Sequence, residues 1–245
     1  MDNNEENIPE QYKELLKKIE AIERALGLSE IEKITKEMEK ESVDIVSDED
    51  LVISPKPEIV LKPKAYLKLA KHALTFANSS INKKDWAEVI GLLTGRIDNE
   101  ETPLEQIVVE DYWPVDQGNA ISVEIVDQKI FTDIFHKKDS KHFIIGWAHS
   151  HPSFTPFLSD DDFGTHLRYQ TFWNKSVAAV IDPLMISQEN NGLGIFRIHE
   201  DKESYYELSN DIEGMSTIAC YESIQMFMKN QFENTEEEEE ENRVG

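Results

Sequence analysis

The most informative part of the chain is His149-Ser150-His151-Pro152, then six residues, then Ser159-Asp160-Asp161-Asp162. A short apolar segment, 143–148, predicts a strand that runs directly into His149. Side chains alternate along a strand, so His149 and His151 point to the same side and both imidazoles can reach one metal ion. A serine followed three positions later by an acid marks a helix start, which places Asp162 in the first turn of the next helix.

Two imidazoles and one carboxylate are ligands of the kind that zinc takes. Three protein ligands with a further position open to water are typical of a catalytic zinc site rather than a structural one. Asp162 also has a simpler interpretation as the acidic partner of the Ser159 cap. The two interpretations are compatible, because the cap fixes where the helix begins. The sequence therefore predicts that His149, His151 and Asp162 bind Zn²⁺.

Two further residues are candidates for the chemistry. Glu88 lies in a mostly apolar predicted strand, 86–95, where it shares a face with Ile90 and Leu92. A glutamate near an activated water can act as general base and then general acid, but by strand pattern alone it would be a carboxylate at a solvated sheet edge. The Ser159 hydroxyl can cap the helix or donate a hydrogen bond to an oxyanion.

Composition narrows the classes of partner. The 245 residues carry a formal charge of −24, from 49 acidic and 25 basic residues. Such a chain repels phosphate backbones and anionic lipid surfaces, so we expect no nucleic-acid and no membrane partner. A basic protein surface would complement it. The one cysteine, Cys220, excludes a disulfide framework and a thiolate metal cage.

We expect a cytoplasmic location for this chain. The first ten residues are polar and acidic and do not resemble a signal peptide. No apolar run approaches the roughly 20 residues that a membrane-spanning helix needs.

The chain divides into three predicted parts. Residues 1–56 form a charged helical extension and linker, in which Leu15, Ile19, Ile22 and Leu26 mark an amphipathic helix. This extension is either a peripheral helical hairpin or an element for docking or dimerisation. Residues 57–205 are the expected catalytic domain. Residues 206–245 hold a helix from about 214 to 232 and an acidic tail expected to be disordered, with six glutamates at 236–241.

The expected fold class is mixed α/β, a mixed sheet with helices packed on it. Pro63 can begin a helix that continues to about Asn78, and Pro114 is expected to stop a strand. The predicted elements are helix 64–78, strands 86–95 and 104–113, helix 127–138, strand 143–148, helix 160–171, and strands 177–181 and 193–199.

The residues over 57–205 resemble the JAMM (MPN+) family of zinc metalloproteases, and within it the deubiquitinase of the proteasome lid and its archaeal relatives. The resemblance rests on Glu88 and the His149-to-Asp162 pattern, with support from 88–95, 118–124, Gly146-Trp147 and 177–183. It implies an MPN fold, a curved mixed sheet flanked by helices. The sequence departs from the lid enzyme at 153–157, where that relative has a glycine- and cysteine-containing stretch, so the rim of the substrate groove is expected to differ.

The resemblance implies a role for each candidate residue. His149, His151 and Asp162 would hold zinc, Glu88 would be the acid/base, and Ser159 would assist the oxyanion. The activity implied is that of an isopeptidase that hydrolyses, through a zinc-activated water, the bond between a ubiquitin or ubiquitin-like modifier and its conjugate. The segment 117–124 would hold the modifier tail as an added strand, or it is an ordinary surface loop; the residues concerned are Gly118, Asn119, Ala120, Ile121, Ser122, Val123 and Glu124.

Two other functions remain open from the sequence. One is a peptidase that acts on a sulfur-carrier protein of ubiquitin fold. The other is a scaffold or binding subunit of a larger complex, with a protein partner or self-association through the N- or C-terminal helices. The intact set of metal-ligating residues favours an enzyme over a scaffold.

Overall fold

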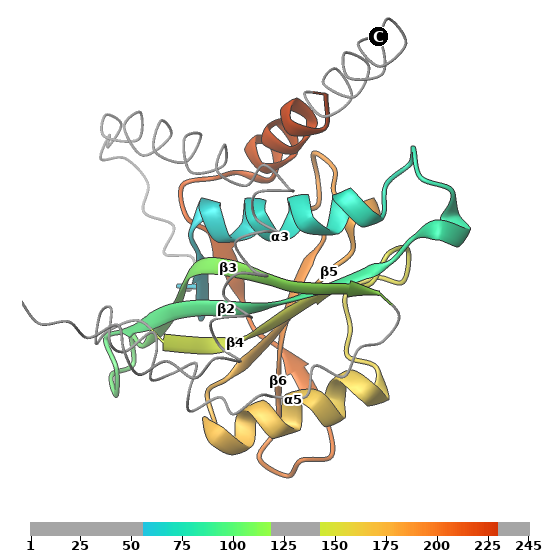
Figure 1. The fold of residues 1–245 in the computed structure, drawn as a ribbon. Helices are drawn as coiled ribbons and strands as arrows, with labels where there is room; N and C mark the ends of the chain where they lie inside the picture. The colour runs from blue at the N-terminus through green and yellow to red at the C-terminus, as the bar shows by residue number, and fades with distance from the viewer. Residues whose placement is uncertain (1–55, 119–142, 230–245) are drawn as a thin grey trace, which may run out of the picture.

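A computed structural model describes residues 56–118 and 143–229. The predicted N-terminal helices, the predicted helix 127–138 and the glutamate tail lie outside the described residues, as do positions 119–124 of the predicted tail-binding segment. In the described part, one mixed sheet has α3 (Pro63–Phe76) on one face and α5 (Asp160–Phe172) on the other (Figure 1). The structure thus confirms the mixed α/β fold class expected from the sequence.

The sheet has eight strands in the order β7-β6-β5-β4-β2-β3-β1-β8. A short 3-10 turn, η1 (Lys83–Asp85), lies between α3 and β2, and a second, η2 (Pro183–Met185), lies between β5 and β6. Residues 217–229 are helical. The strands are β1 (Ile59–Leu61), β2 (Glu88–Asp98), β3 (Gln106–Gly118), β4 (Phe143–Ser150), β5 (Val177–Ile181), β6 (Leu193–Ile198), β7 (Tyr205–Glu207) and β8 (Asn210–Ile212).

The centre of the sheet is formed by β2, β4 and β5. β2 runs antiparallel to β3 and β4, and β4 runs parallel to β5. At the ends of the sheet, β1 pairs in parallel with both β3 and β8, while β5, β6 and β7 are antiparallel neighbours. β8 follows residue 205, so the sheet includes residues on both sides of the expected domain boundary.

The prediction that Pro114 ends its strand was wrong. β3 continues through Pro114 to Gly118, and Pro114 is paired with Gly91 at a register shift between Ile90 and Gly91. A bulge of this kind accommodates a residue that has no N–H to donate. The longer strand matters for the site, because its last residue, Gly118, lies opposite Glu88.

Each face of the sheet has its own hydrophobic core. The larger core lies under α3 and includes Tyr66, Leu69 and Ile145. The smaller core lies on the face of α5 and includes Trp147, Leu158 and Tyr169. In the described part of the chain, no helix combines the length and the apolar character needed to cross a bilayer.

The ladder between β4 and β5 requires a glycine at position 146. A Cβ atom built on Gly146 would lie 1.9 Å from the carbonyl oxygen of Val177, far inside van der Waals contact. The absence of a side chain lets the two backbones approach. The close pairing with β5 therefore fixes the position of β4, and with it the position of His149.

His72 of α3 is a buried histidine of the larger core. Its Nδ1 atom lies 2.8 Å from the Tyr112 hydroxyl, and burial lowers its pKa from 6.5 to about 3. Between about pH 6.5 and pH 3, His72 is therefore protonated in the unfolded chain but neutral in the folded chain. Folding stability must fall as the pH is lowered through this window.

We expect His72→Phe to reduce this acid sensitivity. The variant removes the proton uptake, so its free energy of unfolding should fall less steeply between about pH 6 and pH 4, by about 1.4 kcal/mol per pH unit relative to the wild type. Urea unfolding at a series of pH values measures the two slopes. Parallel slopes would show that His72 is already protonated in the folded protein.

Candidate metal centre

The end of β4 is held on both sides. On the β2 side, His149 lies opposite Ile90, and the backbone N–H of Val89 donates to the Ser150 hydroxyl at 3.0 Å. On the β5 side, the backbone N–H of His151 donates to the Ile181 carbonyl at 2.9 Å. These contacts fix the backbone at both histidines, so their side chains have few orientations left.

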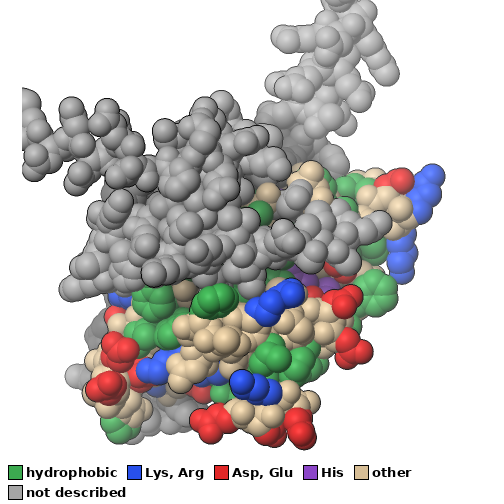
Figure 2. Space-filling model, turned by 60° about the horizontal axis from the view of Figure 1, so that its bottom comes forward, with side chains coloured by type: hydrophobic (Ala, Val, Ile, Leu, Met, Phe, Trp, Pro, Cys, Tyr) green, Lys and Arg blue, Asp and Glu red, His purple; other side chains and the backbone are tan. Residues whose placement is uncertain are grey.

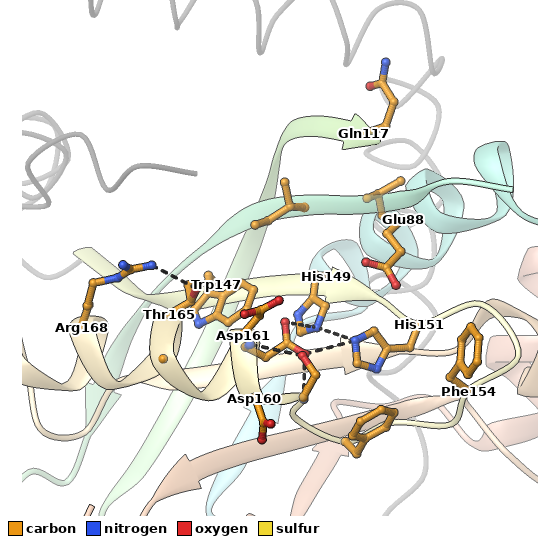
Figure 3. Close-up of a pocket in the computed structure, with 16 residues that line it drawn as sticks. Glu88, Gln117, Trp147, His149, His151, Phe154, Asp160, Asp161, Thr165 and Arg168 are labelled. Carbon is orange, nitrogen blue, oxygen red and sulfur yellow. Dashed lines mark hydrogen bonds and ion pairs between the residues drawn. The ribbon is translucent and has the colours of Figure 1, made fainter. Parts of the chain in front are cut away.

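The three predicted ligands come together in the structure. The Nε2 atoms of His149 and His151 are 3.0 Å apart, and each lies 3.2 Å from an oxygen of the Asp162 carboxylate. Both histidines are buried, and one donor atom of each residue lies within 4.8 Å of the other two (Figure 3). Two imidazole nitrogens and a carboxylate oxygen that face one another are a donor set that suits a divalent transition metal.

Asp162 serves the helix and the centre at the same time. Ser159 is the N-cap of α5, and its side chain and backbone form a capping box with Asp162. The Asp162 Oδ2 atom accepts from the Ser159 backbone N–H at 2.9 Å and from its hydroxyl at 2.6 Å. Both interpretations of Asp162 offered by the sequence thus fit the structure, because one carboxylate reaches the cap and both histidines.

The environment of Asp162 favours its ionised form. Burial raises the pKa of the carboxyl group, but hydrogen bonds from His149, His151 and Ser159 outweigh it and hold the pKa well below its usual range. A carboxylate that stays ionised is the form that binds a cation. The same hydrogen bonds show that the Ser159 hydroxyl points to Asp162 here, so donation to an oxyanion requires it to exchange that partner.

Glu88 lies on the opposite side of the centre from α5. It is the first residue of β2, is partly buried, and lines the same pocket as the three predicted ligands. Its carboxylate extends from β2 toward the two histidines (Figure 3). Gln117 also lines the pocket, and its neighbour Gly118 is paired with Glu88 in the sheet.

Trp147 contacts the centre in a way that the sequence did not indicate. Its ring stacks on His149, with centroids 4.6 Å apart and planes 10° apart, and its Nε1 atom donates to His166 Nδ1 at 3.4 Å. His166 is buried, and burial lowers its pKa to about 3, so it is a neutral core histidine. In the sequence, Trp147 was singled out only as part of the Gly146-Trp147 pair that supports the family resemblance. Its spacing of two residues from His149 on one strand was the available signal.

Stacking takes the place of a hydrogen bond in orienting His149. Among the described residues, the Nδ1 atoms of His149 and His151 have no hydrogen-bond partner. Metal-ligating histidines usually donate from the second ring nitrogen to a carbonyl or carboxylate, which fixes the ring. Here the Trp147 face restricts His149, and the Phe157 ring, 4.7 Å from that of His151, restricts the other imidazole.

The centre opens into a cavity of about 640 Å³, within the size range of ligand sites. Figure 2 shows histidine atoms in a hollow beside acidic and hydrophobic side chains. Beyond the predicted ligands, the charged and aromatic residues of the lining are Glu88, Trp147, Phe154, Phe157, Asp160, Asp161 and Arg168. Arg168 is the one basic residue among these.

Comparison with known proteins places this site in a family context. Residues 56–175 match the sequence profile of the JAB1/Mov34/MPN/PAD-1 ubiquitin protease family. Over 115 residues the chain is 32% identical to the 26S proteasome regulatory subunit RPN11 of Candida glabrata, a match that covers 45% of this chain and 36% of that protein. The ubiquitin carboxyl-terminal hydrolase RPN11 of Saccharomyces cerevisiae is 30% identical over 115 residues, with 45% and 36% covered.

A relative from a second complex is the COP9 signalosome complex subunit 5 of Caenorhabditis elegans, 30% identical over 146 residues that cover 59% of this chain and 38% of that protein. The chain thus spans less than half the length of these curated relatives. The matches confirm the family resemblance inferred from the His149-to-Asp162 pattern.

We expect Trp147→Leu to weaken Zn²⁺ binding about tenfold, because the His149 ring loses the surface that holds its orientation. Trp147→Phe keeps an aromatic face and should bind Zn²⁺ like the wild type. Competition with a chromophoric chelator measures the dissociation constants. Phe196→Leu, in the same small core, controls for general loosening; an equal loss in this variant would contradict the stacking argument.

Proposed function

Because residues 56–175 belong to the JAB1/Mov34/MPN/PAD-1 ubiquitin protease family, we propose that this chain is a zinc-dependent isopeptidase. Its substrates are conjugates of ubiquitin or a ubiquitin-like modifier. The observation that carries the proposal is the meeting of His149, His151 and Asp162 within 4.8 Å in a pocket that Glu88 also lines. The names of the relatives, a ubiquitin hydrolase among them, support the substrate class.

His149, His151 and Asp162 are the proposed zinc ligands. When bound, zinc supplies Lewis acidity that polarises a carbonyl group and acidifies a water molecule. Glu88 is the proposed general base and general acid, because the Glu88 carboxylate reaches the same space from the side of the pocket opposite α5. Glu88 accepts a proton from the attacking water and returns it to the leaving amine.

Ser159 is proposed to stabilise the oxyanion of the tetrahedral intermediate. Its hydroxyl lies in the pocket and donates to Asp162 Oδ2. A cation held by the Asp162 carboxylate would weaken the attraction of that carboxylate for the hydroxyl proton, and the Ser159 hydroxyl could then turn toward the reacting carbonyl.

The end of β3 is the proposed place for the extended modifier tail. Gln117 lines the pocket, and Gly118 lies opposite Glu88. A tail added as a strand here would gain main-chain hydrogen bonds and bring its last peptide bond to the zinc. Asn119, Ala120, Ile121, Ser122, Val123 and Glu124 remain the proposed continuation of this segment.

A second candidate is a subunit role in a larger assembly. The relatives include subunits of the proteasome and of the COP9 signalosome, which favours a protein partner for this chain too. The two roles are compatible, since an assembled subunit can carry an active site. A peptidase acting on a sulfur-carrier protein would use the same residues, and assays with both classes of substrate separate it from an isopeptidase.

We expect Glu88→Gln to abolish cleavage while leaving zinc binding intact. The amide keeps the shape of the side chain but cannot accept the proton, so turnover of a ubiquitin conjugate should fall at least about 100-fold. Glu207→Gln, an exposed glutamate on β7 outside the pocket, is the matched control. A chelator should abolish wild-type cleavage and added Zn²⁺ should restore it. Full turnover by Glu88→Gln would refute the acid/base assignment.

Ser159→Gly separates the two roles of the serine. Glycine at an N-cap lowers the free energy of unfolding by only a few tenths of a kcal/mol, whereas loss of an oxyanion donor lowers kcat about 100-fold or more. We therefore expect a melting temperature near that of the wild type, with a large loss in kcat. Thermal unfolding and steady-state kinetics on one protein preparation test both; an unchanged kcat would leave Ser159 with the cap alone.

A further inference from the structure

The loop after His151 carries an exposed aromatic side chain at the rim of the pocket. Phe154 lines the pocket, yet 65% of its surface is accessible to solvent. Neighbouring Phe157 is less exposed and packs on the His151 ring. Phe154 thus presents an apolar face beside the metal centre, available to whatever enters.

The backbone on both sides of Phe154 is in an unusual conformation. Ser153 and Thr155 have φ values of 70° and 64°, in a region that residues other than glycine rarely adopt. The Phe154 N–H donates to the His151 carbonyl at 3.2 Å, which closes a turn with Pro152 and Ser153 at its centre. Proline followed by a positive φ is the type II pattern, in which glycine normally takes the second place. Backbone strain of this kind persists only where surrounding contacts hold it.

Asp182 supplies those contacts. Its carboxylate is 1% exposed and accepts from the backbone N–H of Ser153 at 3.0 Å and of Thr155 at 3.1 Å. A third bond, from the Leu184 N–H at 3.0 Å, ties the same carboxylate to η2. The residues on either side of Phe154 are thus fixed to one buried anion, so the ring is presented by a rigid loop. The backbone of His151 is held separately, by Ile181.

The pocket has two ends, and Phe154 lies at the same end as Glu88, the proposed general acid. In Figure 3, Glu88, His151 and Phe154 lie toward one end, while Thr165 and Arg168 of α5 lie toward the other. A group that protonates the leaving amine must lie on the side where that amine departs. In an isopeptide, this amine is the ε-nitrogen of a lysine.

We propose that Phe154 is a specificity-determining residue that packs on the aliphatic stem of the acceptor lysine, with Asp182 as its positioning residue. The inference rests on the proposed isopeptidase function and names the part of the substrate that this loop recognises. Acylation has removed the lysine charge, so an isopeptide presents a neutral, flexible four-carbon stem next to the scissile bond. The exposed face of Phe154 provides an apolar surface for that stem, and burial of both favours binding.

The test is a series of ubiquitin conjugates that differ only in stem length. Ubiquitin is joined through its C-terminal carboxyl group to the side-chain amine of lysine, ornithine, diaminobutyrate or diaminopropionate within one short peptide. For the zinc-loaded full chain, kcat/KM should fall as the stem shortens. Phe154→Ala should lower kcat/KM for the lysine conjugate about tenfold, mainly through KM, and should leave the shortest stem almost unaffected.

Phe172→Ala is the matched control, because Phe172 is exposed to nearly the same extent, 62%, but does not line the pocket. It should behave as the wild type on every conjugate, and Phe154→Tyr should keep the dependence on stem length. An equal loss on all four conjugates, or no loss, in Phe154→Ala would overturn the inference while leaving the proposed function intact. A wild-type chain that cleaves none of them would overturn the proposed function itself.

Asp182→Asn tests the positioning role. An amide can still accept from Ser153 and Leu184, but its NH₂ group faces the Thr155 N–H if the oxygen keeps its place, so one end of the loop is released. We expect the dependence on stem length to weaken as in Phe154→Ala, with a Zn²⁺ dissociation constant within about threefold of the wild type. Unchanged dependence on stem length, or zinc binding lost to the same extent as cleavage, would show that Asp182 does not act through Phe154.

Discussion

The whole site depends on how the end of β4 is fixed between its two neighbours. The Ser150 hydroxyl accepts from β2, and the His151 N–H donates to the end of β5. The alternation of side chains then turns His149 and His151 to one side, and the same pairing brings the start of β2, with Glu88, over that side. Two of the proposed ligands and the proposed acid/base are therefore positioned by hydrogen bonds within one sheet, which is stiffer than a loop.

The third proposed ligand, Asp162, comes from α5, and its position depends on a helix cap. A serine N-cap contributes about 1 kcal/mol to stability, and here the capping partner is the carboxylate that faces both histidines. The helix therefore begins at the residue that aims Asp162 at the centre. The cap and the proposed centre share the Asp162 carboxylate, so a substitution at Asp162 affects both.

The rim of the pocket is a strained loop, residues 153–155, that hydrogen bonds to Asp182 hold in place. Left-handed backbone at Ser153 and Thr155 costs about 1 to 3 kcal/mol per residue, and hydrogen bonds to an ionised group contribute about 1.5 to 3 kcal/mol each. The buried Asp182 carboxylate accepts two such bonds from these residues. The two magnitudes are comparable, which explains how a strained loop remains ordered beside the centre. Of the proposed ligands, His149 and Asp162 lie in β4 and α5 and His151 directly follows β4, whereas the rim lies on a loop held by one buried carboxylate.

The sequence by itself determined the fold class, most of the strands, the start of α5 and the identity of the clustered residues, because strand alternation and helix capping act over a few residues. It missed β1, β7 and β8, which are three residues long each and exist through pairing with other strands: β1 with β3 and β8, and β7 with β6. It also ended the strand before Pro114, since the bulge in β3 that accommodates this proline depends on the register with β2. Trp147 over His149, and Asp182 beneath the loop 153–155, were decided only by the tertiary structure. Stacking and the burial of a charge depend on which surfaces meet across the sheet, and no local spacing records that.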